Sequence, residues 1–272
     1  MPSFACISVE KLERLTGTPN CPAILDVRTE VDFAGDPRLI PGSSRRAFGP
    51  NEDWLEDFGG RAVVVVCHKG HAVSQGVAAI LRQRGVGAQT LEGGHLAWAS
   101  AGMPLVPVDR LPRRALGRTQ WVTRERPKVD RIACPWLIRR FVDPKASFLF
   151  VAAGDVMGVA EKFAATPFDV EGVAWSHRGE RCTFDVMVEE FGLATPPLLR
   201  LAAIVRGADT SRHDLAPEAA GLLAASLGLS RMHADDHDQL EAGMGLYDAF
   251  YRWCRDATGE THNWPARGGK SK

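Results

Sequence analysis

Runs and spacings of apolar residues predict an α/β segment early in the chain. Four consecutive valines, residues 63–66, form a β-branched run that is typical of a strand buried on both faces, as in a parallel sheet. A short polar turn follows at 67–71, and apolar residues at helical spacing then predict a helix over 72–84, which Gly85 ends. A strand, a short loop and a helix in this order indicate a parallel sheet with helices packed on it.

After about residue 119 the pattern changes to helical periodicity with few strands. Aromatic and β-branched runs at 121–123 and 148–151 predict strands. Helices are predicted over 136–142, 156–163, 184–191, 198–205, 219–227 and 236–255. We therefore expect a first domain at 1–107 and a helix-rich α+β domain at 119–265. The Pro- and Arg-rich segment 108–118 predicts an exposed linker between them, and 266–272 a disordered tail.

Composition narrows the classes of protein that fit this chain. Its 272 residues carry 33 basic and 33 acidic side chains, so no overall charge attracts nucleic acid or a membrane surface, and neither is expected as a partner. The six cysteines are dispersed without a Cys-x-x-Cys pair, which is typical of a reducing compartment. No secretory leader and no apolar run of about 18 residues is present, so we expect a cytoplasmic protein.

Cys67 is the first candidate for chemistry because it begins the polar turn after the valine strand. At that edge of a parallel sheet the loop amides and the positive end of the following helix converge on the sulfur and favour a thiolate. Lys69, with His68 or His71, adds positive potential. The alternative is a plain buried cysteine. Such cysteines usually lie inside an element, so the position favours a nucleophile.

Residues 8–107 resemble the rhodanese (sulfurtransferase) family at four spaced motifs. These are Ile24–Arg28 with its Asp-x-Arg pair, Ile40–Ser43, the loop beginning at Cys67, and Leu91–Trp98 with its Gly-Gly turn. The resemblance implies a five-stranded parallel sheet with helices on both faces, and Cys67 as carrier of a persulfide, without a cofactor. It also implies a small sulfur donor held by His68, Lys69, Gly70 and His71, and a thiol acceptor. Ala72 stands where the family commonly has a donor-binding residue. From their spacing, Asp26 and Arg28 are expected to form a structural ion pair at the end of the active loop.

The second domain resembles the C-terminal domain of chromate-resistance ChrB-type proteins. The matching segments are 126–141, 176–185, 204–210 and the helix beginning near 235. This resemblance implies a role in chromate resistance as a regulator or accessory protein. A rhodanese-like domain occupies the place of the regulators' N-terminal portion, which argues against a DNA-binding role.

Histidines and carboxylates from three separated segments of the second domain predict a divalent metal site. We take His177, Asp209 and His237 as its ligands, with Glu180 or Glu241 as second choices. Zinc, iron and manganese all accept such ligands. The alternative is that each histidine caps or hydrogen-bonds locally.

Arginines near Cys134 and Trp136 predict a competing site for a tetrahedral oxyanion such as chromate or sulfate. Arg131 would bind it. Arg139 and Arg140 are neighbours on a helix, so at most one of them is expected to join Arg131.

Two functional hypotheses follow from these residues. In the first, the chain is a sulfurtransferase whose Cys67 accepts sulfane sulfur, coupled to a metal- or oxyanion-binding domain. In the second, it is a chromate-responsive sensor or regulator that binds ligand without turnover. The retained nucleophile and the absence of a basic DNA-binding motif favour the first.

Overall fold

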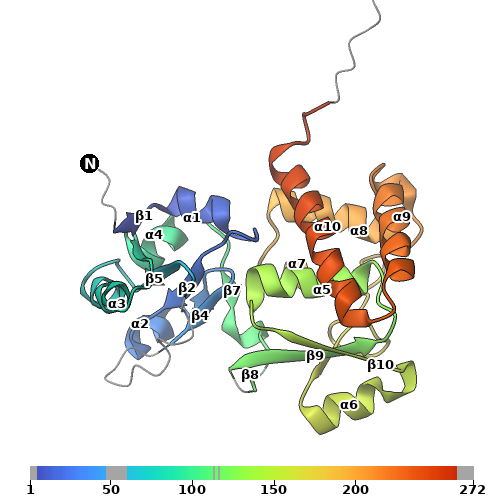
Figure 1. Ribbon diagram of the computed structural model, residues 1–272, viewed down its shortest axis with the longest axis horizontal. Helices are drawn as coiled ribbons and strands as arrows, with labels where there is room; N and C mark the ends of the chain where they lie inside the picture. The colour runs from blue at the N-terminus through green and yellow to red at the C-terminus, as the bar shows by residue number, and fades with distance from the viewer. Residues whose placement is uncertain (1–4, 47–59, 113, 116, 262–272) are drawn as a thin grey trace, which may run out of the picture.

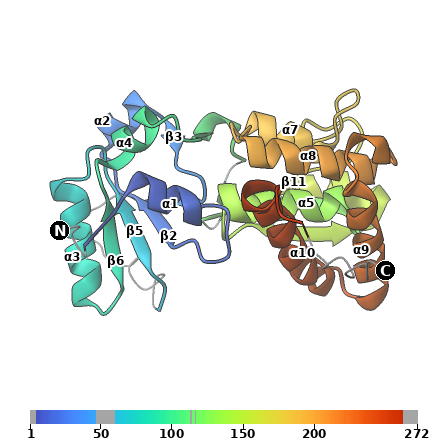
Figure 2. The same cartoon turned by 90° about the horizontal axis from the view of Figure 1, so that it is seen from above.

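The computed structural model describes residues 5–46, 60–112, 114–115 and 117–261, which form two domains side by side (Figures 1 and 2). The N-terminal domain, drawn in blue and teal, contains one parallel sheet with helices around it. The C-terminal domain, drawn from green to red, is mostly helical. The predicted tail at 266–272 lies outside the described residues.

The N-terminal sheet has five parallel strands in the order β1-β6-β5-β2-β4. Its strands are β1 (Cys6–Ile7), β2 (Ala23–Asp26), β4 (Ser43–Arg45), β5 (Val63–Val66) and β6 (Ala88–Leu91). The valine strand β5 lies at the centre, where it pairs with β2 from Ala23↔Val63 to Asp26↔Val66 and with β6 on its other side. The predicted five-stranded parallel sheet is confirmed.

The four valines of β5 point alternately to two separate cores, one on each face of the sheet. Val63 and Val65 pack with Val77 and Leu81 of α3 (Ala72–Gln83). Val64 and Val66 pack on the other face with α1 (Val9–Leu15) and α4 (Gly94–Ser100). Burial on both faces is the reason that the strand is apolar at every position rather than at alternate ones. The remaining helix, α2 (Glu30–Gly35), precedes the short strand β3 (Arg38–Leu39).

Part of the predicted linker 108–118 belongs to the secondary structure of the two domains. β7 (Val106–Pro107) pairs with β3 of the N-terminal domain, and η2 (Val108–Arg110) follows it. β8 (Arg114–Ala115) already pairs with β9 of the C-terminal domain. Both ends of the 108–118 segment therefore attach directly to a sheet.

The C-terminal sheet is formed by β9 (Arg118–Arg124) between β10 (Ser147–Val151) and β11 (Thr166–Pro167), all parallel. α6 (Val156–Phe163) covers one face of this sheet, and the other helices cover the opposite face (Figure 1). The helices after the strand β9 are α5 (Asp130–Leu137), η3 (Ile138–Val142), α7 (Thr183–Glu190), α8 (Pro196–Asp209), η5 (His213–Leu215), α9 (Ala219–Met232) and α10 (Asp236–Asp256), with η4 (Ala153–Asp155) ahead of α6.

The helix predicted at 136–142 differs most from its expected bounds. α5 already begins at Asp130, six residues earlier, and includes Pro135, before the chain continues as the π-helix η3. A proline inside a helix removes one amide donor and normally marks a boundary, which is why the sequence favours a later start. Burial of α5 offsets that loss, and it includes Trp136, whose ring packs on Phe184 and Tyr247.

The two domains touch at η3. The amide of Gly42 donates to the carbonyl of Phe141 at 2.6 Å, and the ring of Phe141 fills the space that a side chain at Gly17 would need. Among the described residues, no helix combines the length and the apolar character needed to cross a bilayer.

Candidate functional site

Cys67 lies immediately after β5 and is the first residue of the turn that leads into α3. Its side chain is buried, with 7% of the residue exposed, and its Sγ lies 3.1 Å from the hydroxyl oxygen of Ser74. His68 is half-buried, whereas Lys69 and His71 are exposed on the same turn. The structure therefore places the predicted nucleophile and its predicted donor-binding residues on one loop at the carboxyl end of the central strand.

Backbone contacts from the Gly93–Gly94 turn hold this loop in place. The amide of His95 donates to the carbonyl of Cys67 at 2.9 Å, and the amide of Leu96 donates to the carbonyl of His68 at 3.0 Å. Gly94 has a φ of +62°, and a Cβ there would lie 2.3 Å from the Cys67 carbonyl oxygen. Only glycine permits this approach, so the Gly-Gly turn packs directly against the Cys67 loop and holds it in position.

Replacing Gly94 with alanine is therefore expected to destabilise the protein by about 2–3 kcal/mol or more, because both the positive φ and backbone atoms oppose the new methyl group. Gly85→Ala is the matched control, since Gly85 has a φ of +80° but no atom lies within 4 Å of the place that its Cβ would take. Urea unfolding of both variants measures the difference. Equal losses in the two variants would contradict a close-packed turn.

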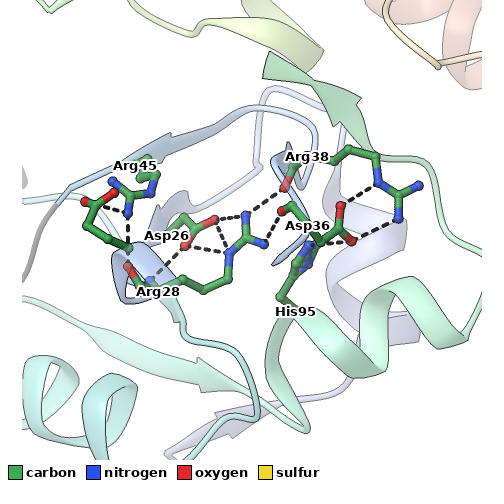
Figure 3. Close-up of polar contacts among 7 residues, drawn as sticks. Asp26, Arg28, Asp36, Arg38, Arg45 and His95 are labelled. Carbon is green, nitrogen blue, oxygen red and sulfur yellow. Dashed lines mark hydrogen bonds and ion pairs between the residues drawn. The ribbon is translucent and has the colours of Figure 1, made fainter. Parts of the chain in front are cut away.

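Asp26 and Arg28 form a buried ion pair in the same domain (Figure 3). The Nη2 of Arg28 lies 2.6 Å from Oδ2 of Asp26, and neither side chain is more than 4% exposed. The guanidinium also donates to the carbonyls of Asp36 and Arg38 at 2.8 and 2.7 Å. The predicted ion pair is thus present, but it binds the segment after α2 rather than the end of the active loop.

His95 connects that network to Cys67. Its Nε2 lies 3.4 Å from Oδ2 of Asp36 (Figure 3). Its backbone amide donates to the Cys67 carbonyl. Burial, with the nearby Arg28 charge, lowers the pKa of His95 to about 4, although the Asp36 carboxylate acts in the opposite direction. Burial prevails because the residue is only 2% exposed. His95 is therefore neutral in the folded protein at neutral pH.

This lowered pKa predicts acid sensitivity. Because the unfolded chain protonates near the ordinary pKa of 6.5 and the folded protein only near 4, His95 contributes stability above pH 6.5 that is lost as the pH falls toward 4. The loss should be on the order of 3 kcal/mol. Unfolding free energies measured from pH 7 to 4 should decline less in His95→Gln than in the wild type. His213→Gln, at an exposed histidine, should leave the profile unchanged.

In the C-terminal domain, His177 lies among three aspartates. Its Nε2 is 3.5 Å from Oδ2 of Asp130, 3.5 Å from Oδ1 of Asp169 and 3.3 Å from Oδ2 of Asp209. Asp130 begins α5, Asp209 ends α8, and the other two residues lie in the chain between β11 and α7. One ligand atom each from Asp130, His177 and Asp209 fits within 4.8 Å, a spacing that a single metal ion could bridge.

The surroundings of this Asp-His cluster (Asp130, Asp169, His177 and Asp209) orient the carboxylates. Asp130 is fully buried and accepts the amides of Thr183 and Phe184, at the start of α7, at 2.6 and 3.1 Å. Asp169 accepts the Thr183 hydroxyl at 2.9 Å. The His177 side chain is 40% exposed, so the Asp-His cluster opens to solvent on that side.

Charge is concentrated in the Asp-His cluster. Burial and the neighbouring Asp130 and Asp169 carboxylates raise the pKa of Asp209 to about 7. Hydrogen bonds to Asp130 and Asp169 raise the pKa of His177 to about 10, so the imidazole is a cation at neutral pH. A protonated histidine therefore holds together carboxylates that would otherwise repel one another.

Three of the predicted metal ligands lie elsewhere, which corrects the ligand set. His237 is at the first turn of α10, where its ring makes an edge contact with Phe150 at 5.4 Å. Glu241 forms an ion pair with Arg139, and Glu180 is exposed in the turn before α7. Both His237 and Glu241 are exposed on α10, and their contacts are with Phe150 of β10 and Arg139 of η3 rather than with the Asp-His cluster.

The arginines of the predicted oxyanion site also lie in two separate places. The Nε of Arg131 lies 3.3 Å from Oδ2 of Asp169, so it neutralises part of the Asp-His cluster. Arg139 and Arg140 instead line one cavity together with Asp143. Neither of them joins Arg131, because Arg139 pairs with Glu241 and Arg140 pairs with Asp248, both on α10.

Sequence reasoning missed Ser74, Asp130 and Asp169. Asp130 lies inside the 126–141 segment, directly before a run of apolar helical residues, and that position was its only signal. Ser74 and Asp169 carry no local signal, because their roles depend on contacts with Cys67 and His177.

Comparison with known families matches both domains. The family model for the rhodanese-like domain matches residues 8–101, and that for the C-terminal domain of ChrB matches residues 121–254. The chain joins a rhodanese-like domain to a ChrB C-terminal domain. Both predicted resemblances are thereby confirmed.

Individual relatives cover parts of the chain. Protein ChrB of Cupriavidus metallidurans is 36% identical over 157 residues, which are 56% of this chain and 47% of that protein, so the chain spans about half the length of this curated relative. A rhodanese-related protein from Thermoplasma volcanium is 24% identical over 37% of this chain and 96% of its own, with a TM-score of 0.33. A rhodanese-like domain protein from Staphylococcus aureus is 29% identical over 34% of this chain and 89% of its own, with a TM-score of 0.30.

Proposed function

We propose that the chain is a sulfurtransferase-type protein in which Cys67 carries a persulfide. The observation that supports this most directly is the position of Cys67 in the rhodanese-like domain, at the carboxyl end of β5 and in contact with Ser74. The Ser74 hydroxyl can donate a hydrogen bond to the sulfur and favour its thiolate. Exposed Lys69 provides positive charge, and exposed His71 a hydrogen-bonding ring, for an anionic donor at the mouth of the loop.

The proposed reaction is two successive displacements at sulfur. The Cys67 thiolate attacks the sulfane sulfur of the donor, the donor's S–S bond breaks, and the electron pair leaves with the remainder of the donor, which is sulfite when thiosulfate is used. An acceptor thiolate then attacks the outer sulfur of the persulfide, and Cys67 leaves as a thiolate. Neither step needs an external oxidant, a metal or a general base.

The assay that tests this proposal is thiocyanate release from thiosulfate and cyanide. The alternative, a chromate-responsive sensor or regulator, predicts ligand binding without turnover. Thiocyanate produced catalytically, beyond one equivalent of protein, would support the enzyme. A single equivalent or none would favour the sensor.

A second proposed function rests on the Asp-His cluster. We propose that Asp130, His177 and Asp209 bind a divalent metal, with Asp169 orienting them. The donor set is richer in carboxylate than in imidazole, which favours manganese or iron(II) over zinc. The exposed side of His177 leaves access for a further ligand such as water or an oxyanion.

Together these sites suggest the cellular role. We propose that the protein contributes to chromate or oxyanion resistance, supported by its ChrB C-terminal domain, and that it acts in the cytoplasm, supported by its free cysteines. The likeness to Protein ChrB covers about half of that relative, and the role is proposed on the C-terminal domain alone.

A further inference from the structure

Two exposed apolar residues, Val31 and Leu96, form an apolar rim on either side of the Cys67 loop. Among the described residues of the N-terminal domain, the exposed large hydrophobic side chains are Val31 at 84%, Ile80 at 36% and Leu96 at 47%. Val31 lies on α2 and Leu96 on α4, the helices that follow β2 and β6, and these strands are the two neighbours of β5. Because parallel strands end at the same edge of a sheet, both helices begin beside the loop that follows β5.

Backbone hydrogen bonds connect both sides of the rim to the loop. On one side, the amide of Leu96 donates to the carbonyl of His68 at 3.0 Å. On the other side, the amide of Val27 donates at 2.8 Å to the carbonyl of Val66, the residue before Cys67. The helix α2 begins three residues after Val27. The two exposed apolar residues therefore lie at the entrance to the site rather than on a remote face of the domain.

The structure describes all six cysteines, and none of the other five is placed to take sulfur from Cys67. Cys6 lies on β1, which β6 separates from β5. Cys21 precedes β2 and therefore lies at the edge of the sheet opposite Cys67. The remaining three are buried in the C-terminal domain, namely Cys134, Cys182 and Cys254. An acceptor thiol must therefore come from another molecule.

A persulfide on Cys67 places the reacting atom closer to the apolar rim. Its outer sulfur lies one S–S bond, about 2 Å, beyond the Sγ of a residue that is only 7% exposed. The narrow side chain of an acceptor cysteine can approach that atom from outside, while the residues on either side of this cysteine stay at the rim. Apolar neighbours lose contact with water there by packing against Val31 and Leu96. Exposed Lys69 favours the attacking thiolate.

We infer that the sulfur acceptor is a protein cysteine with apolar residues on both sides, and that Val31 and Leu96 select it. This inference rests on the persulfide chemistry proposed for Cys67. The acceptor thiolate attacks the outer sulfur, the bond between that sulfur and Sγ breaks, and Cys67 keeps the electron pair as a thiolate. The acceptor leaves as a persulfide, so the transfer needs no further reactant. A small hydrophilic acceptor gains nothing from the rim.

Single-turnover sulfur transfer from the full-length protein tests this selection. The protein is loaded with thiosulfate, freed of excess donor and mixed with one of two blocked pentapeptides, Gly-Leu-Cys-Leu-Gly or Gly-Ser-Cys-Ser-Gly. Mass spectrometry follows the peptide persulfide over time. The leucine peptide should react at least about fivefold faster, because its side chains leave water as the transition state forms. In the double variant Val31→Ser/Leu96→Ser the ratio of the two rates should fall to near one.

Ile80→Ser is the matched control, because Ile80 is the third exposed hydrophobic residue of the domain and lies about 12 Å along α3 from its first residue. This variant should keep the wild-type ratio. Equal rates for the two peptides in the wild type, or a wild-type ratio in the double variant, would overturn the inference while cyanide-removable sulfur on Cys67 still supports the proposed function. If no sulfur loads onto Cys67, the proposed function fails and this inference fails with it.

Discussion

Replacing Cys67 with serine is expected to reduce thiocyanate release from thiosulfate and cyanide by at least about a thousandfold, because serine cannot form the persulfide intermediate. Mass spectrometry of the wild-type protein after donor treatment should show a cyanide-removable addition of about 32 Da, the mass of one sulfur atom, on Cys67. Cys67 is the thiol that begins the loop after β5. Because it is buried, only small donors can reach its sulfur.

Two further variants sharpen this prediction. Ser74→Ala removes the hydroxyl 3.1 Å from the sulfur and should lower turnover by about tenfold, the usual contribution of one hydrogen bond to a charged group, while leaving the persulfide on Cys67. Cys21→Ser is the control for loss of a thiol in the same domain and should retain full activity. Persulfide on another cysteine, or full activity in Cys67→Ser, would refute the assignment.

Manganese(II) is expected to bind the full-length protein at one site and to raise its melting temperature, and His177→Ala should weaken this binding by about a hundredfold. Asp209→Asn is the more discriminating variant. It relieves the repulsion that raises the pKa of Asp209, so the metal-free variant should be at least as stable as the wild type while binding manganese weakly. His237→Ala, at the α10 residue whose ring contacts Phe150, should bind metal normally.

The pKa of His177 determines the direction in which manganese affinity changes with pH. His177 carries a proton up to a pKa of about 10 in the metal-free fold, against 6.5 ordinarily, so its stabilising contribution is complete below pH 6.5 and is lost as the pH rises toward 10. A metal must displace that proton, and manganese affinity should therefore increase from pH 6 to pH 8. Isothermal titration and thermal melts across this range provide the measurement. Absence of saturable binding throughout, with melts unaffected by chelators, would leave the Asp-His cluster as a structural ion network.

Within the N-terminal domain, local sequence patterns were sufficient to predict the central strand and the Cys67 loop. The valine run specified β5 because burial on both faces requires apolar residues at every position, and the Cys67 loop followed from its sequence order. Gly70 and Gly94 both have a positive φ, which is the conformation that favours glycine at these turn positions. The ends of elements were less well specified, as in α5, where burial outweighed the helix-breaking tendency of Pro135.

Tertiary structure alone decided which side chains share a site. His177 and Asp209 belong to different segments, and nothing local indicates that packing of α5, α7 and α8 brings Asp130 to them while α10 carries His237 away. The separation of Arg131 from Arg139 and Arg140 has the same cause, since Arg131 pairs with Asp169 whereas the other two pair with carboxylates of α10. The local sequence is sufficient to predict a site whose residues all lie in one loop, as around Cys67. Chemistry assembled across elements depends on how their buried faces pack, which is a property of the whole core.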